Sequence, residues 1–112
     1  MSLPYSDASL QVDVSVQLNE QAPESVTLVS KDGEWSGVSV NDLVVRVKPQ
    51  LIENDEQQQV LVESEISQRQ DGALVLLHKP RLLVTLAEEA VMRFLSDQDE
   101  QLLTLRFKVT SL

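Results

Sequence analysis

The stretch from Ala73 to Leu86 limits the possible folds more than any other part of the chain, because it is strongly apolar and is interrupted by a proline. Residues 73–77 and 82–86 form two apolar runs, and the turn dipeptide Asp71-Gly72 precedes the first of them. Short apolar runs bounded by turn signals are typical of buried β-strands. Proline lacks an N–H to donate to a ladder, so it occurs at bulges, edges or strand starts. We therefore predict two short strands, or one bent strand with a bulge at Pro80.

The clearest single strand is predicted from Leu10 to Leu18, where apolar residues occupy every second position. This period of two is the pattern of a strand with one buried face. Comparable strand signals recur along the chain at spacings of about 8–12 residues, with turn residues between them. The segment from Ala87 to Ser96 is ambiguous, because its apolar residues fit both an alternating and a helical spacing. We prefer a strand there and keep one short helix at 87–96 as the alternative.

Together these signals predict an all-β fold, either an antiparallel β-sandwich or a small barrel of about eight strands. At 112 residues the chain is expected to form one domain. Residues 1–9 are predicted to be a flexible lead-in, and residues 10–112 to be the single β domain. The start Met1-Ser2-Leu3 resembles a sequence added by an expression vector. Whether the natural chain starts upstream of residue 4 is therefore left as an open question.

One hairpin is predicted from the dipeptide Asp32-Gly33. Asp-Gly supplies the positive φ values of a type I′ turn, so residues 31–34 are expected to join a strand at 26–30 to a returning strand at 35–40. Trp35 opens the returning strand. We interpret it as a lid on the core, because of the large area that it can bury, and a platform for a ligand is the alternative.

A second strand pair has a testable register. If the numbers of paired residues in segments 43–51 and 60–66 sum to 111, apolar residues face apolar residues and opposite charges face each other. A slip of one residue would spoil both faces. Cross-strand pairs of this kind contribute about 0.2–1 kcal/mol each, so we read the charges as structural rather than as a binding patch. The predicted pairs are Arg46–Glu65, Lys48–Glu63, Val45–Ile66 and Leu51–Val60.

The composition excludes several classes of function. The formal net charge is −9 and the pI is about 4.4, which opposes binding to nucleic acid and docking on anionic lipid. The chain has no cysteine, so it has neither disulfides nor thiolate metal sites. A membrane-spanning helix needs about 20 consecutive apolar residues, and Lys79 and Arg81 interrupt the longest apolar stretch. We therefore expect no nucleic-acid partner and no membrane insertion by this chain.

No catalytic constellation is visible in the sequence. His78 is the only histidine and no serine lies in a nucleophile elbow, so we read His78 as a polar residue at a strand end. The acidic runs at 54–56 and 97–100 lack the spacing and the turn glycine of a calcium loop, and the three glycines form no nucleotide motif. We predict no catalytic, metal-binding or cofactor-binding residue, and no cofactor. Binding would then depend on shape, and the candidate residues are Trp35, His78, Lys79 and Arg81.

From residue 43 onward, several features occur in a recognisable order. A strand with a proline comes first, then an apolar run, a Pro-Arg pair, an acidic step and a closing alternating strand. The residues concerned are Leu43, Val45, Val47, Pro49 and Leu51, then Leu77, Pro80, Arg81, Leu82, Val84, Thr85, Leu86, Glu89 and Ala90. In this order, residues 43–112 resemble the β domain of bacterial secretins, the channel proteins of outer-membrane secretion. The turn before Ala90 departs from that family, since it is one residue short and lacks the usual Asp and Gly or Asn, and no membrane-spanning amphipathic hairpins are present.

Three functional hypotheses follow. We prefer a non-enzymatic protein-binding or accessory β module, which the resemblance implies would be a stand-alone relative in the bacterial cell envelope. The alternatives are a soluble regulatory or sensory fragment of a larger envelope protein and an enzyme of unrecognised type. A protein partner is expected, and a homodimer formed by pairing of edge strands is an alternative. The sequence does not determine the compartment, although the periplasm or envelope is favoured over the cytoplasm.

Overall fold

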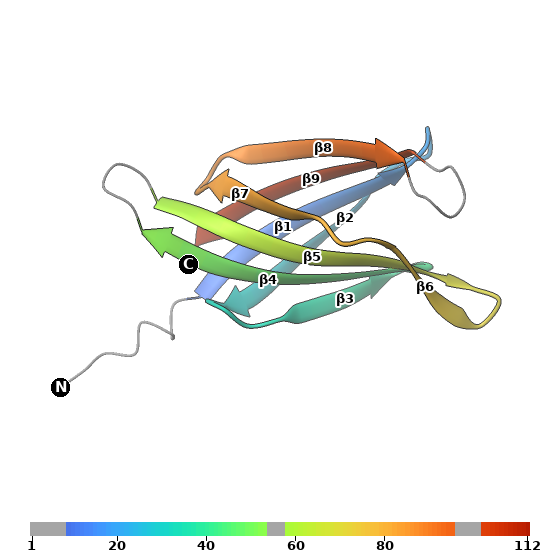
Figure 1. The fold of residues 1–112 in the computed structure, drawn as a ribbon, viewed down its shortest axis with the longest axis horizontal. Coiled ribbons are helices and arrows are strands. Elements are labelled where there is room, and N and C mark those ends of the chain that lie inside the picture. Colours follow the sequence, from blue (N-terminus) through green and yellow to red (C-terminus); the bar gives the residue numbers. More distant parts are fainter. Residues whose placement is uncertain (1–8, 54–57, 96–101) are drawn as a thin grey trace.

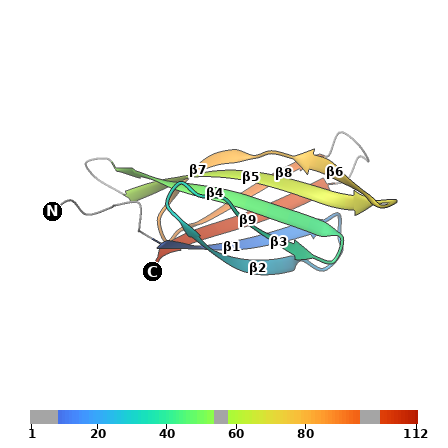
Figure 2. The ribbon, with the colours of Figure 1, turned by 90° about the horizontal axis from the view of Figure 1, so that it is seen from below.

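Two antiparallel β-sheets lie face to face in the computed structural model, which describes residues 9–53, 58–95 and 102–112 (Figures 1 and 2). The described residues form nine strands and no helix. They are β1 (Ser9–Leu18), β2 (Glu24–Lys31), β3 (Ser36–Val40), β4 (Leu43–Glu53), β5 (Gln58–Gln70), β6 (Ala73–His78), β7 (Arg81–Thr85), β8 (Glu89–Leu95) and β9 (Leu102–Ser111). The first sheet has the order β2-β1-β9-β8, and the second has the order β3-β4-β5 with β6 and β7 both beside β5.

This architecture confirms the prediction of an all-β sandwich. The ambiguous segment at 87–96 contains the strand β8, so the alternative of a short helix is wrong. Because the described residues contain no helix, they include none that is long and apolar enough to cross a membrane. The predicted lead-in and the two acidic runs at 54–56 and 97–100 lie outside the described residues, apart from Ser9, which begins β1.

The core lies between the two sheets and is built mainly by alternation of buried and outward residues. In β1, every second residue from Leu10 to Val16 is buried, as its period of two predicts. The inward residues of β9 include Phe107, the largest of the fully buried side chains. Leu43, Val45 and Val47 of β4 and Val60, Val62 and Ile66 of β5 belong to the same hydrophobic cluster. The alternation therefore places most polar and charged side chains on the outer faces of the sheets, together with some exposed apolar residues such as Val29, Leu83 and Val91.

The pairing of β4 with β5 has the predicted register. Arg46 lies opposite Glu65, and Lys48 lies opposite Glu63. The apolar pairs Val45–Ile66 and Leu51–Val60 are also formed. This pair could be predicted because one register satisfies both faces at once.

Pro80 separates β6 from β7, but it does not carry the bulge. Both strands pair with β5. In β7 and at His78 the two residue numbers of each pair add up to 144, as in Glu63–Arg81 and Ile66–His78. From Leu76 back to Ala73 the residue numbers of each pair add up to 143 instead, so the register shifts by one between Leu76 and His78. The extra residue of this bulge is the buried Leu77. Pro80 accepts a hydrogen bond on its carbonyl from the Ser64 N–H, at 2.9 Å, but it has no N–H to return. The prediction of two short strands is confirmed, and the alternative of a bulge at Pro80 is wrong.

The predicted hairpin at residues 31–34 is also wrong, because β2 and β3 belong to different sheets. Residues 31–34 do form a turn, in which the Glu34 N–H donates to the Lys31 carbonyl, but only Gly33 of its two central residues has a positive φ, of 81°. This is the pattern of a type II turn, not of a type I′ turn. The turn is bound to β4 by a hydrogen bond from the Gly33 N–H to the Pro49 carbonyl, at 2.7 Å. The chain is thereby carried from the first sheet to the second.

The type I′ geometry occurs instead at the second Asp-Gly dipeptide. Asp71 and Gly72 have φ values of 52° and 80°, and they close the hairpin between β5 and β6. The two dipeptides are locally equivalent. The difference between them comes from the strands that follow, since only the second dipeptide is followed by a strand that pairs with its predecessor.

Candidate functional site

The outer face of the second sheet carries two rows of side chains that cross the strands. Directly paired residues of neighbouring strands share a face, so the registers of β3, β4, β5 and the β6–β7 edge define each row. The first row contains Trp35, Lys48, Glu63 and Arg81, and the second contains Gly37, Arg46, Glu65 and Lys79. Trp35 lies one residue before β3, and the register of β3 continued by one residue places it opposite Lys48. Lys79 lies two residues before β7, and the register of β7 continued by two residues places it opposite Glu65.

Trp35 lies on this outer face, where two cations cover its ring. The Arg46 Cζ lies 4.8 Å from the ring centroid and the Lys48 Nζ lies 5.5 Å from it, both within the range of a cation–π interaction. The Trp35 side chain is 39% exposed and does not belong to the core cluster. The interpretation of Trp35 as a lid on the core is therefore wrong. Ser36 pairs with the buried Val47 and takes the inward position, which turns its neighbour Trp35 outward.

Gly37 makes room for this arrangement. It lies opposite Arg46, and a Cβ built on it would meet the Arg46 Cγ at 3.0 Å. The spacing of two residues places Trp35 and Gly37 on the same face, so the arginine stem crosses the bare glycine on its way to the indole ring. An aromatic side chain beside a strand glycine also covers backbone that the glycine leaves open.

Ion pairs hold most of the charges in the two rows. Arg46 binds Glu65 at 2.7 Å, while Glu63 binds Lys48 at 3.1 Å and Arg81 at 3.7 Å. Lys79 has no ion-pair partner in the described part of the chain. Four cations thus face two carboxylates. Since the whole chain has only nine lysines and arginines and a net charge of −9, this is a local surplus of positive charge on an acidic protein.

A hollow of about 250 Å³ lies among these groups. Trp35 lines one side of it, the carboxylate pair Glu63 and Glu65 lies in the middle, and Lys79, Pro80 and Arg81 line the β6–β7 side. The lone charge of Lys79 and the partly engaged Arg81 therefore lie beside an aromatic surface. We call this group of six residues the Trp35 hollow.

The structure thus brings together three of the four candidates from the sequence. Trp35, Lys79 and Arg81 line the hollow, whereas His78 does not. His78 pairs with the buried Ile66 and is itself half-buried. Sequence reasoning read the charges of β4 and β5 as purely structural and so missed that two of them also line the site. A hairpin centred on Asn41-Asp42 would have placed Trp35 opposite Lys48 and revealed the connection.

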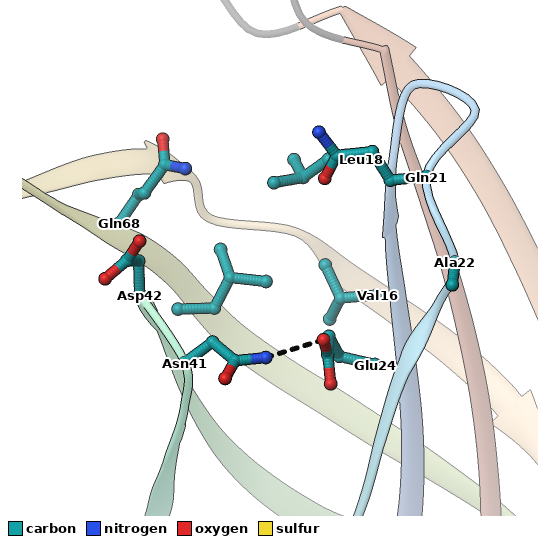
Figure 3. A pocket seen from close by; sticks show the side chains of 9 residues that line it. Val16, Leu18, Gln21, Ala22, Glu24, Asn41, Asp42 and Gln68 are labelled. Atoms are coloured by element: carbon teal, nitrogen blue, oxygen red, sulfur yellow. Dashed lines mark hydrogen bonds between the residues drawn. The ribbon is translucent and has the colours of Figure 1, made fainter.

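A second hollow, of about 150 Å³, lies at one end of the sandwich (Figure 3). Asn41 Nδ2 donates to Glu24 Oε1 at 2.6 Å and so links the turn before β4 to β2, while Asp42 and Gln68 lie on the other side of the space. The volume is below the roughly 300–1,000 Å³ that is usual for ligand pockets. No group of metal-ligating side chains occurs among the residues described. We read this hollow as part of the contact between the two sheets.

A third hollow, of about 370 Å³, lies on the outer face of the first sheet. Its polar side chains bind one another. The Thr27 hydroxyl donates to Asp13 Oδ1 at 2.7 Å, and Arg106 lies 3.4 Å from Glu89. Its two carboxylates balance its two cations, and its one aromatic side chain, Phe107, is fully buried. The Trp35 hollow, with an exposed ring and a surplus of positive charge, is therefore the stronger candidate.

Comparison of the chain with protein-family models, curated proteins and solved structures finds no significant match. The resemblance to the secretin β domain stays a prediction, and so does the envelope location that it implies. The function is therefore argued from the geometry of the Trp35 hollow.

Proposed function

We propose that this protein is a non-enzymatic binding module that docks a carboxylate-bearing segment of a partner protein at the Trp35 hollow. The observation that carries the proposal is the gathering of four cations on the sheet face that carries Trp35, two of them over its ring, on a chain of net charge −9. Lys79 supplies an ammonium without an internal carboxylate partner among the residues described. Arg81 is only loosely engaged at 3.7 Å, and its side chain is 68% exposed.

The chemistry of the hollow favours an acidic segment with apolar neighbours. Lys79 and Arg81 attract a carboxylate, and Arg81 has a planar fork that can bind both carboxylate oxygens. Trp35 offers an apolar face beside these charges, and tryptophan and arginine are the residues that most often dominate the energy of an interface. The acidic remainder of the protein repels the same ligand, which orients its approach toward the hollow.

The size of the site favours a protein partner over a small ligand. A hollow of about 250 Å³ is smaller than the roughly 300–1,000 Å³ pockets that enclose drug-sized molecules. The two rows that surround it extend across the whole width of the sheet, from Trp35 to Arg81. A peptide segment can cover such a surface, because its contacts are spread along an extended chain.

Fluorescence titration tests the proposal directly, because Trp35 is the only tryptophan. The probe is acetylated tetraglutamate amide, with tetralysine amide as its matched control. We expect the acidic peptide to change the Trp35 emission in a saturable way that weakens as salt is added, because salt screens charge attraction.

Two charge variants separate the site from the rest of the surface. Lys79→Gln and Arg81→Gln are each expected to weaken binding about fivefold or more. Lys108→Gln removes the same charge from the exposed outer face of the other sheet and is expected to leave binding unchanged. Equal weakening by all three variants would show attraction to charge in general, and no response of folded protein to tetraglutamate would refute the proposal.

A further inference from the structure

The strand β6 forms an open edge of the second sheet. It pairs with β5 on one side, and no described strand lies on its other side. Figures 1 and 2 show the β5–β6 hairpin extending beyond the end of the sandwich, so its outer border is accessible. Leu74 and Leu76 are 57% and 45% exposed on this strand. The edge therefore combines unpaired backbone with exposed apolar side chains.

The other edges carry the usual protection against pairing, and β6 does not. Natural edge strands are shielded by charged residues, by proline or by short length. Charged side chains occur in β2 at Glu24 and Lys31 and in β8 at Glu89 and Arg93. The strands β3 and β7 have only five residues each, and β7 begins with Arg81 directly after a proline. The six residues of β6 include no Asp, Glu, Lys, Arg or Pro. The sequence thus leaves this one edge of the described sheets fit for the addition of a strand.

The register shows which backbone groups face outward. The type I′ turn closes on the pair Gln70–Ala73, and in an antiparallel ladder such closing residues bond to each other while the next residue along turns its groups away. By this alternation, Leu74 and Leu76 present their N–H and C=O groups to the open edge. The bond from the Ser64 N–H to the Pro80 carbonyl fits the same alternation beyond the bulge.

The bulge at Leu77 joins this edge to the Trp35 hollow. Before the bulge, the outward side chains are Leu74 and Leu76, and after it they are Lys79 and Arg81. Without the extra residue, the period of two would turn Lys79 and Arg81 to the inner face. The outer face of this edge therefore carries two exposed leucines, Leu74 and Leu76, followed along the chain by two cations, Lys79 and Arg81.

We propose that an extended segment of another protein adds to the β6 edge as an antiparallel strand. Two apolar side chains of this segment, two residues apart, lie over Leu76 and Leu74. Carboxylates on the N-terminal side of them lie against Arg81 and Lys79. This inference rests on the proposed function and gives the backbone conformation and the direction of its ligand. Charge complementarity favours such a segment over a second copy, since β6 itself has no carboxylate and two copies would each bring a net charge of −9.

The test uses a peptide with the expected pattern, acetyl-Glu-Thr-Glu-Thr-Val-Thr-Val-Thr-amide, and a control with lysines in place of the glutamates. Binding is measured by calorimetry, and the amide hydrogen exchange of the protein by NMR. We expect the acidic peptide to slow exchange at Leu74 and Leu76 by about tenfold or more, because their N–H groups become hydrogen-bonded. We expect the control peptide not to bind.

Three variants of one residue separate backbone from side chain. Leu76→Pro removes an N–H that faces the open edge and is expected to raise the Kd about tenfold or more. Leu76→Thr keeps the N–H, loses the apolar contact and should have a smaller effect. Leu76→Lys adds the charge that natural edges carry, and it keeps the test open if the proline variant fails to fold. Circular dichroism and urea unfolding check each fold.

The outcomes distinguish this inference from the function on which it rests. If the acidic peptide binds and Lys79→Gln weakens it, but Leu76→Pro does not and the two amides stay unprotected, strand addition is refuted and the Trp35 hollow stands. Equal binding of the lysine peptide would refute the choice of an acidic ligand. A concentration-dependent dimer in sedimentation that Leu76→Lys abolishes would show that a second copy occupies the edge. Failure of both tetraglutamate and this peptide would refute both proposals.

Discussion

The guanidinium of Arg46 lies over the indole of Trp35, with Cζ 4.8 Å from the ring centroid. The same guanidinium binds Glu65 at 2.7 Å on the next strand. Arg46 therefore fixes the aromatic side of the hollow to the carboxylates in its middle. A site whose ring and charges are held in this way needs little reordering when a ligand arrives, which preserves binding free energy.

Replacement of Arg46 by methionine tests this link. Arg46→Met keeps much of the apolar stem but loses a cation–π contact worth about 0.5–1 kcal/mol at an exposed site and an exposed ion pair worth about 0.2–1 kcal/mol. We expect the free energy of unfolding in urea to fall by about 1 kcal/mol and the Trp35 emission to shift to the red, because the ring gains water. The control Arg106→Met also removes an ion pair, with Glu89, but lies on the other sheet. It should leave the emission unchanged, and an equal spectral shift would contradict the link.

Ser64 lies under the Trp35 hollow with its hydroxyl buried and without a hydrogen-bond partner among the residues described. A buried hydroxyl without a partner costs free energy, so Ser64→Ala is expected to stabilise the protein by about 1 kcal/mol. Ser30 is equally buried, but its hydroxyl donates to the Glu34 carbonyl at 2.7 Å. Ser30→Ala should therefore destabilise by about 1 kcal/mol. Urea unfolding of the two variants should show opposite signs, and a loss of stability in Ser64→Ala would indicate a hydrogen-bonded water at this position.

Ala87 has a φ of 70° in the turn between β7 and β8. This left-handed conformation costs an L-residue about 1–2 kcal/mol, while glycine adopts it freely but loses about 0.4–1 kcal/mol through its more flexible unfolded state. We expect Ala87→Gly to raise the free energy of unfolding by about 0.5 kcal/mol. Ala73→Gly, at a strand position without a positive φ, should lower it. Thermal unfolding of both variants measures the contrast, and a destabilised Ala87→Gly protein would mean that this turn carries no strain.

Asp32 links the turn after β2 to the second sheet, since its Oδ1 accepts a hydrogen bond from the Leu51 N–H at 2.8 Å. Asp32→Ala leaves this donor without its partner and is expected to destabilise the protein by about 1–2 kcal/mol. Asp32→Asn retains an acceptor oxygen and should recover most of the loss. Urea unfolding provides the comparison. If the asparagine variant were as unstable as the alanine variant, the charge of Asp32 rather than the hydrogen bond would be responsible.

The sequence by itself determined the strands and one strand pairing. In β1, alternation alone indicates which side chains are buried, because a strand turns successive residues to opposite faces, and in β9 only the buried Thr104 departs from this rule. The register of β4 on β5 was also predictable, because Arg46 and Lys48 can meet Glu65 and Glu63 only where Val45 also meets Ile66. In these cases the residues that decide the structure lie within a few positions of one another or in adjacent strands.

Only the tertiary structure decided how the strands divide between the sheets, and with that where the site lies. Asp32-Gly33 and Asp71-Gly72 are the same dipeptide, yet one crosses between sheets and the other closes a hairpin. Hydrogen bonds to Pro49 and Leu51, far along the chain, accompany the first outcome. The outward turn of Trp35 and the bulge at Leu77 likewise depend on which strands lie beside them. The physical reason is that local propensity selects a conformation for each segment, whereas its neighbours are selected by contacts between residues distant in the sequence.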